Sequence, residues 1–95
     1  MNSEGGENLQ GFKYHTDQEA QALALINQGK LKESEEIYRS LITSGTNNHL
    51  VYENLAAICG IQGRWGDATR LLKQTLQLKP NYPDAHNNLG VALKG

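Results

Sequence analysis

Apolar residues recur every three or four positions along most of this chain, with polar residues between them. This spacing places apolar side chains on one face of an α-helix, so it predicts helices. Gly29 and Gly63 follow two such stretches, and glycine readily adopts the left-handed conformation that ends a helix. Pro80 disfavours helical geometry before it, whereas Pro83 suits a first helical position. We expect no strand and five helices, over about residues 16–29, 32–43, 49–63, 66–79 and 83–94.

The first helix is expected to begin near Thr16. Thr16 and Glu19 have the spacing of a capping box, in which each side chain satisfies a backbone N–H at the helix start. Residues 1–14 contain three glycines, two glutamates and few apolar residues, which predicts a flexible N-terminal tail. Asn48 is placed to cap the third helix, because a short polar side chain just before a helix can accept a hydrogen bond from a backbone N–H of its first turn.

The pattern of residue types repeats with a period of 34. Gly63 corresponds to Gly29 and Ala56 to Ala22 when this number is subtracted. A period of this length is typical of helical hairpins that stack, each burying one face on its neighbour. The sequence therefore predicts one all-α domain over residues 15–95, made of a repeat at 15–48, a repeat at 49–82 and a partial repeat at 83–95.

Residues at fixed positions in these units resemble the tetratricopeptide repeat (TPR) family. In the unit that starts at His49, Ala56 and Ala68 fill the small-residue positions and Pro80 the closing proline. The further matches in this unit are Tyr52, Leu55, Cys59, Leu72 and Thr75. The resemblance implies a right-handed α-solenoid of antiparallel helix pairs, with about two and a half TPR units and five helices.

The first unit, from His15, fits this pattern less well. Ser34 stands where the family has alanine, and Thr46 stands where it has proline. Polar residues suit a terminal unit, because one of its sides faces water.

The third unit also resembles the repeats of O-GlcNAc transferase-like and bacterial multi-repeat proteins. In those proteins an asparagine lines the inner groove and bonds the backbone of an extended peptide, and the matching residues here are Asn54 and Asn88. A side-chain amide suits this task, since it both donates and accepts hydrogen bonds. The alternative is that both are ordinary solvated residues. The resemblance implies a peptide-binding groove at Glu19, Leu23, Glu53, Asn54, Ala57, Asp84, Asn87 and Asn88.

Another known use of this fold clamps the terminal carboxylates of a peptide with basic residues. Of the positions that form this clamp, only Asn54 matches, and Glu19 and Asp84 would repel a carboxylate. We therefore reject the carboxylate clamp and expect a neutral or basic extended segment.

Composition excludes several other partners. The net charge of −1 provides no basic surface for nucleic acid, and no stretch approaches the roughly 20 apolar residues of a membrane span. A single cysteine excludes an internal disulfide and fits a reducing compartment. With no basic, apolar secretory start, we expect a cytoplasmic location. The acidic run at residues 33–36 is interpreted as a solvated helix face.

No residue set indicates catalysis, a metal or a cofactor. His15, His49 and His86 lack ligand spacing with one another or with Cys59, which occupies a core position. Trp65 is interpreted as an aromatic at the edge of the core. No nucleophile, base and orienting group occur together, so we do not expect an enzyme.

The sequence thus favours a protein-interaction scaffold that binds an extended peptide or partner segment, as part of a longer repeat array. Two alternatives remain open. The chain could be the N-terminal recognition or spacer segment of a larger bacterial enzyme such as a glycosyltransferase. It could also form a homodimer through the unpaired fifth helix, whose apolar face lacks a following partner.

Overall fold

The computed structural model describes the backbone of residues 3–95 and the side chains of residues 15–95. This part of the chain forms five α-helices and no strand. The helices are α1 (Ser3–Asn27), α2 (Leu31–Thr43), α3 (His49–Ile61), α4 (Trp65–Leu78) and α5 (Pro83–Lys94). The predicted all-α solenoid of helix pairs is confirmed, and α2 to α5 begin and end within about two residues of their expected limits. The handedness of the solenoid remains a prediction.

The predicted start of the first helix is wrong. α1 begins at Ser3, so Thr16 and Glu19 lie inside a continuous helix and not at its first turn. Residues 7–13 include Glu, Leu, Gln and Lys, which favour helix. Once residues 16–27 are helical, each added residue gains one backbone hydrogen bond without a new nucleation cost, so the helix extends. Residues 1–2 and the side chains up to residue 14 lie outside the described part, and a flexible tail there stays a prediction.

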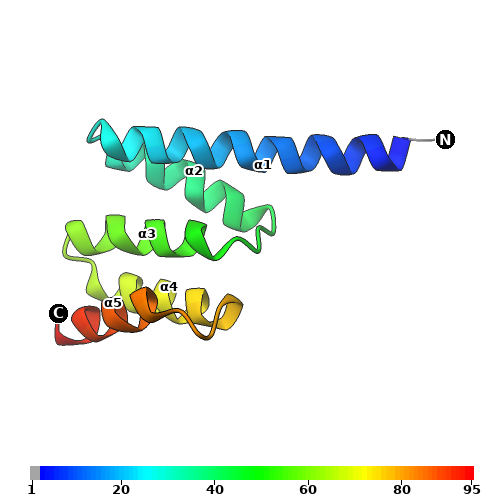
Figure 1. Ribbon diagram of the computed structural model, residues 1–95. Coiled ribbons are helices and arrows are strands. Elements are labelled where there is room, and N and C mark those ends of the chain that lie inside the picture. Colours follow the sequence, from blue (N-terminus) through cyan, green and yellow to red (C-terminus); the bar gives the residue numbers. More distant parts are fainter. Residues whose placement is uncertain (1–2) are drawn as a thin grey trace.

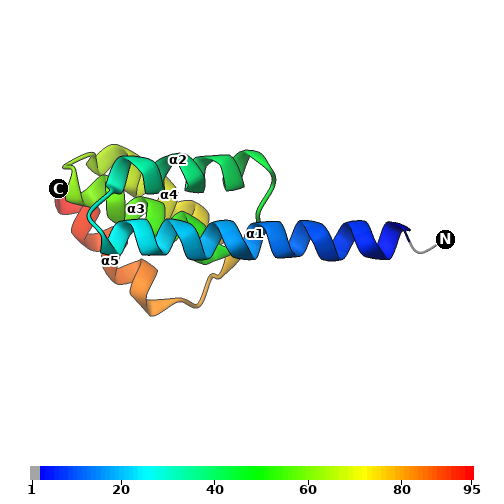
Figure 2. The ribbon, with the colours of Figure 1, turned by 90° about the horizontal axis from the view of Figure 1, so that it is seen from above.

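The helices stack in chain order. Each helix packs mainly on the next one, and the molecule measures 54 × 30 × 18 Å. Figure 1 shows this stack, with the N-terminal part of α1 projecting beyond the end of α2. In the view of Figure 2, α2 and α4 lie towards one side of the molecule, and α1 and α5 towards the other. Residues of α1 and α3 line one pocket and residues of α3 and α5 line another, so these three helices form one face of the stack, called here the α1/α3/α5 face.

The core is centred on α3, which has a neighbouring helix pair on both sides. Leu55, Ile58 and Cys59 are fully buried there, and Tyr38 and Leu41 of α2 pack against the same cluster. Small residues lie where helices approach closely; the buried alanines are Ala22, Ala56, Ala68, Ala85 and Ala92. The burial predicted for Cys59 is confirmed, and it raises the pKa of this thiol.

The 34-residue period extends to the backbone hydrogen bonds of the turns. Gly29 and Gly63 both have positive φ, at 77° and 74°. The N–H that follows each glycine donates to the carbonyl five residues earlier, at 2.8 Å in both turns: Lys30 to Leu25, and Arg64 to Cys59. This is the Schellman arrangement that closes a helix, and glycine allows it without strain.

Ser34 and Thr46, which differ from the TPR pattern in the first unit, both form hydrogen bonds with their side chains. Ser34 is fully buried, and its hydroxyl donates to the carbonyl oxygen of Ala22 at 2.8 Å, which ties α2 to α1. The Thr46 hydroxyl accepts from the Asn48 N–H at 3.2 Å. Asn48 in turn accepts from the N–H of Leu50 at 3.0 Å, which confirms its predicted role as a helix cap.

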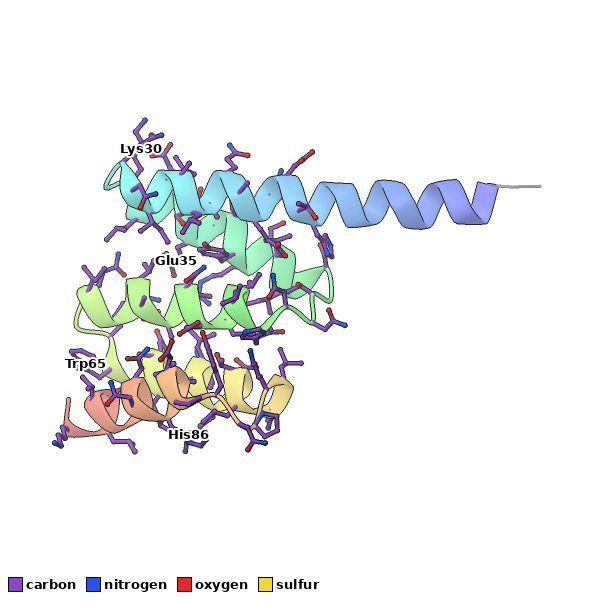
Figure 3. All side chains as sticks on the ribbon, in the orientation of Figure 1. Lys30, Glu35, Trp65 and His86 are labelled. Atoms are coloured by element: carbon purple, nitrogen blue, oxygen red, sulfur yellow. The ribbon has the colours of Figure 1, made fainter. Side chains whose placement is uncertain are left out.

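The acidic run at residues 33–36 is solvated only in part. Glu33 and Glu36 are exposed, but the Glu35 side chain is 15% exposed and accepts from both Arg39 and Arg64. Arg64 bonds its two carboxylate oxygens at 3.1 Å each, and these bonds hold the pKa of Glu35 below its usual range. Figure 3 shows Glu35 in the space between α2 and α3. The prediction of a wholly solvated face is therefore wrong at Glu35, which joins the first helical hairpin to the second.

Candidate functional site

Two pockets open on the α1/α3/α5 face. The first, called the α1/α3 pocket, has a volume of about 270 Å³. Glu19 and Leu23 of α1 line one of its sides, Leu50 and Asn54 of α3 the other, and Tyr38 of α2 also lines it. Most of its accessible lining is apolar, although Glu19 and Asn54 contribute charge and an amide.

The second, called the α3/α5 pocket, has a volume of about 190 Å³. Glu53 and Ala57 of α3 and Asn88 and Val91 of α5 line its sides. The remaining lining residues are small or apolar and come from α3, α4 and α5: Ala56, Gly60, Trp65, Ala68, Leu72 and Ala92. Trp65, the first residue of α4, lies beside the connection between α3 and α4 (Figure 3).

The two pockets occupy equivalent places in successive repeats. Adding 34 converts Glu19 into Glu53, Leu23 into Ala57, and Asn54 into Asn88. Six residues of the predicted groove are thus brought together in two groups: Glu19, Leu23 and Asn54 in one pocket, and Glu53, Ala57 and Asn88 in the other. Their role in binding a peptide remains a prediction.

Asp84 and Asn87 are not brought into either pocket. Both are exposed on the first turns of α5. The sequence prediction also missed residues that line the pockets from the other helix layer, mainly Tyr38 and Leu72. These two are 34 residues apart, so the repeat itself is the signal that could have identified them.

Asn54 and Asn88 have different surroundings. The Asn54 amide donates to the hydroxyl oxygen of Tyr38 at 3.2 Å, and Tyr38 is only 1% exposed. Burial raises the pKa of the Tyr38 hydroxyl. Asn88 is exposed, and no protein hydrogen bond of its side chain is found among residues 15–95. Asn54 therefore has a structural contact, whereas the amide of Asn88 is available to a bound molecule.

The carboxylate of Glu53 is held at the side of the α3/α5 pocket. The Tyr82 hydroxyl donates to its Oε1 atom at 2.7 Å, and this bond raises the pKa of Tyr82 to about 12. Tyr82 itself is positioned by a T-shaped contact with the His49 ring, at 5.1 Å between centroids, and by the Lys79 ammonium, 4.9 Å from its ring centre. Tyr82 engages one oxygen of Glu53, so Oε2 remains for a ligand.

Charge is distributed unevenly between the two helix layers. From residue 15 onward, α1, α3 and α5 contain four carboxylates, Asp17, Glu19, Glu53 and Asp84, but only one lysine, Lys94, and no arginine. The other lysines and arginines from residue 15 onward lie on α2, α4 and the connections. The α1/α3/α5 face is therefore built from acidic helices, and it attracts positive charge more than negative charge.

The described residues offer little else for chemistry. Across residues 15–95, no three or more His, Cys, Asp or Glu side chains gather in a way that could hold a metal ion. His86 contacts the carbonyl oxygen of Pro80 at 3.0 Å, and His49 packs on Tyr82, so both have structural contacts. Within the described part of the chain, no helix is long and apolar enough to cross a membrane.

Comparison with known proteins agrees with the fold. Residues 58–95 match the family profile of the TPR repeat. Among solved structures, the second TPR domain of Spaghetti (RPAP3), bound to the HSP90 peptide SRMEEVD, is similar with a TM-score of 0.83 and 20% identity. The similarity covers 93% of this chain and 82% of that one. No curated protein matches the sequence. The shared fold and the match over residues 58–95 both support the TPR repeat family.

Proposed function

We propose that this chain is a protein-interaction scaffold that binds an extended peptide or partner segment along the α1/α3/α5 face. The observation that carries the proposal is the pair of pockets at equivalent positions of successive repeats. An extended chain can place side chains in both pockets while amide groups beside them bond its backbone. A TPR domain of similar fold is bound to a peptide, which supports this type of function.

The charge of the face favours a neutral or basic segment. The peptide in the similar structure, SRMEEVD, contains three acidic residues. Here Glu19 and Glu53 line the two pockets, and from residue 15 onward the helices of the face contain one lysine and no arginine. An acidic segment would meet like charge, so the proposed partner differs from that peptide in the sign of its charge.

The proposal is for binding without catalysis. Specificity would come from pocket shape and from a small number of polar groups, in the manner of other pre-formed sites. The positions of Asn54 and Asn88 support a relation to O-GlcNAc transferase-like and bacterial multi-repeat arrays. A cytoplasmic location would suit a binding protein of this kind.

A selection from a random peptide library tests the proposal, run on the whole chain and on two variants. Asn88→Ala removes the exposed amide that lines the α3/α5 pocket, and Gln77→Ala removes an exposed amide of α4, which belongs to the other helix layer and lines neither pocket. Enrichment that weakens with Asn88→Ala and persists with Gln77→Ala supports binding on this face. Equal enrichment by all three proteins would place the binding elsewhere, and no enrichment by the folded chain would contradict the proposal.

A further inference from the structure

We infer that the α3/α5 pocket is the anchor for one large apolar side chain of the bound segment, with a lysine or arginine of that segment paired to Glu53. The inference rests on the proposed function and assigns a ligand chemistry to one of its two pockets. The apolar group would be of the size of leucine, methionine or phenylalanine.

The volume and the lining of the pocket fit such a group. An apolar cavity of about 150 Å³ in a protein can hold benzene, and this pocket measures about 190 Å³. The buried alanines Ala56, Ala68 and Ala92 come from three different helices and form part of its lining. Their small side chains leave the space that a larger side chain would fill. Most of the accessible lining is apolar, so water in the pocket gains few hydrogen bonds and is readily displaced.

The equivalent pocket of the preceding repeat is less suited to an apolar anchor. Leu23, which is 49% exposed, occupies there the position that Ala57 has in the α3/α5 pocket. Where the α3/α5 pocket has Leu72, the α1/α3 pocket has Tyr38, whose hydroxyl is bonded to Asn54. With Ala57 in place of Leu23 and Leu72 in place of Tyr38, the α3/α5 pocket has the less polar wall, and at about 190 Å³ against 270 Å³ it is also the smaller of the two pockets.

Glu53 gives this pocket its charge preference. The Tyr82 hydroxyl donates to Oε1 at 2.7 Å and so already restricts the Glu53 carboxylate. Less conformational entropy is therefore lost when a cation binds to this carboxylate. Asn88 lines the pocket from α5 and can bond the peptide backbone next to the anchored side chain. In an extended chain, side chains two positions apart point the same way, so a basic residue two positions from an apolar one matches the arrangement of carboxylate, amide and apolar walls.

The test compares the sequences that a displayed library of random nine-residue peptides yields on different variants. Ala57→Leu adds a larger side chain at the exposed edge of the α3/α5 pocket, the residue that the preceding repeat has at the same position, and so takes up part of the space that the anchored side chain needs. Ala24→Leu adds the same side chain at an exposed site of α1 that lines neither pocket, so it serves as the matched control. Glu53→Gln keeps an acceptor for Tyr82 and removes the charge.

Selection on the unmodified chain is expected to enrich a large apolar residue with lysine or arginine two positions away. The most enriched peptide, made synthetically, should bind Ala57→Leu at least about tenfold more weakly than the unmodified chain, because a leucine-sized group then stays in water. Ala24→Leu should bind it as before. Selection on Glu53→Gln should keep the apolar residue and lose the basic preference.

Two results would overturn the inference, and they differ in what they say about the proposed function. Enriched peptides that lack a large apolar residue, or that bind Ala57→Leu unchanged, would exclude the anchor and leave peptide binding intact. A chain that folds and enriches no peptide would exclude both.

Discussion

Replacing Asn54 by alanine removes the amide that donates to the Tyr38 hydroxyl at 3.2 Å. Tyr38 is among the largest fully buried side chains, so its hydroxyl has little access to other partners in the folded state. The net contribution of such a hydrogen bond to stability is about 0.5–1.5 kcal/mol. Alanine is also a better helix former than asparagine, by up to about 0.7 kcal/mol, and this gain offsets part of the loss.

Asn88→Ala separates these two effects. It makes the same change of residue type inside a helix at the equivalent position one repeat later, where the side chain is exposed. It therefore retains the gain in helix propensity and lacks the lost contact. The free energy of unfolding of Asn54→Ala should be about 1 kcal/mol lower than that of Asn88→Ala. For a chain of this length, that difference corresponds to about 4–8 °C in Tm.

Urea unfolding followed by circular dichroism measures both values. A double-mutant cycle with Tyr38→Phe then isolates the contact, because phenylalanine removes the accepting oxygen and keeps the ring. The cycle should give a coupling free energy of about 1 kcal/mol between the two positions. Equal stabilities of the two alanine variants, together with a coupling near zero, would refute the assigned hydrogen bond.

Three further predictions concern other parts of the fold. Gly90→Ala should raise the free energy of unfolding by about 0.5–1 kcal/mol in urea titrations, because a Cβ at this helical position meets no atom within 4 Å; a loss of stability would mean that the site is crowded. Glu35→Gln should destabilise the chain near neutral pH. Because Arg64 lowers the pKa of Glu35 in the folded state, the stabilisation is present above its ordinary pKa and is lost as pH falls through the folded value. The urea midpoints of variant and parent should therefore converge as the pH falls below the ordinary pKa of a glutamate, about 4.3, and a constant gap would contradict this. Cys59 should resist a thiol reagent at about pH 8 until urea unfolds the chain, since it is buried and its pKa is raised; rapid labelling of the folded chain would be inconsistent with the core described.

The repeat made most of the fold predictable from sequence. A 34-residue period constrains every helix and turn twice, so Gly29 supports the interpretation of Gly63. The start of α1 is the exception. The first residues of α3 and α5, His49 and Pro83, lie 34 and 68 positions after His15, so the period and the capping signal at Thr16 both placed this start near residue 15. A helix that is already formed can extend past such a signal, as α1 does.

The candidate site was predictable in part for a related reason. Residues on α1, α3 and α5 could be assigned to one face from their positions in the repeat. The pocket interior depends on which side chains from the other layer reach it, as Leu72 does, and on how much space small residues leave. Glu35 illustrates the same limit, because its bonds to Arg64 cross 29 positions of sequence and link different hairpins.

The central claim is that a peptide binds on the α1/α3/α5 face, and NMR chemical-shift mapping tests it most directly. A ¹⁵N-labelled chain would be titrated with a lysine-rich peptide library pool and, separately, with its glutamate-rich counterpart. The account predicts that the lysine-rich pool shifts the amide signals of Leu23, Ala57 and Asn88 and leaves those of Arg39 and Arg70 on α2 and α4 in place. Shifts confined to Arg39 and Arg70, or an equal response to the glutamate-rich pool, would contradict it.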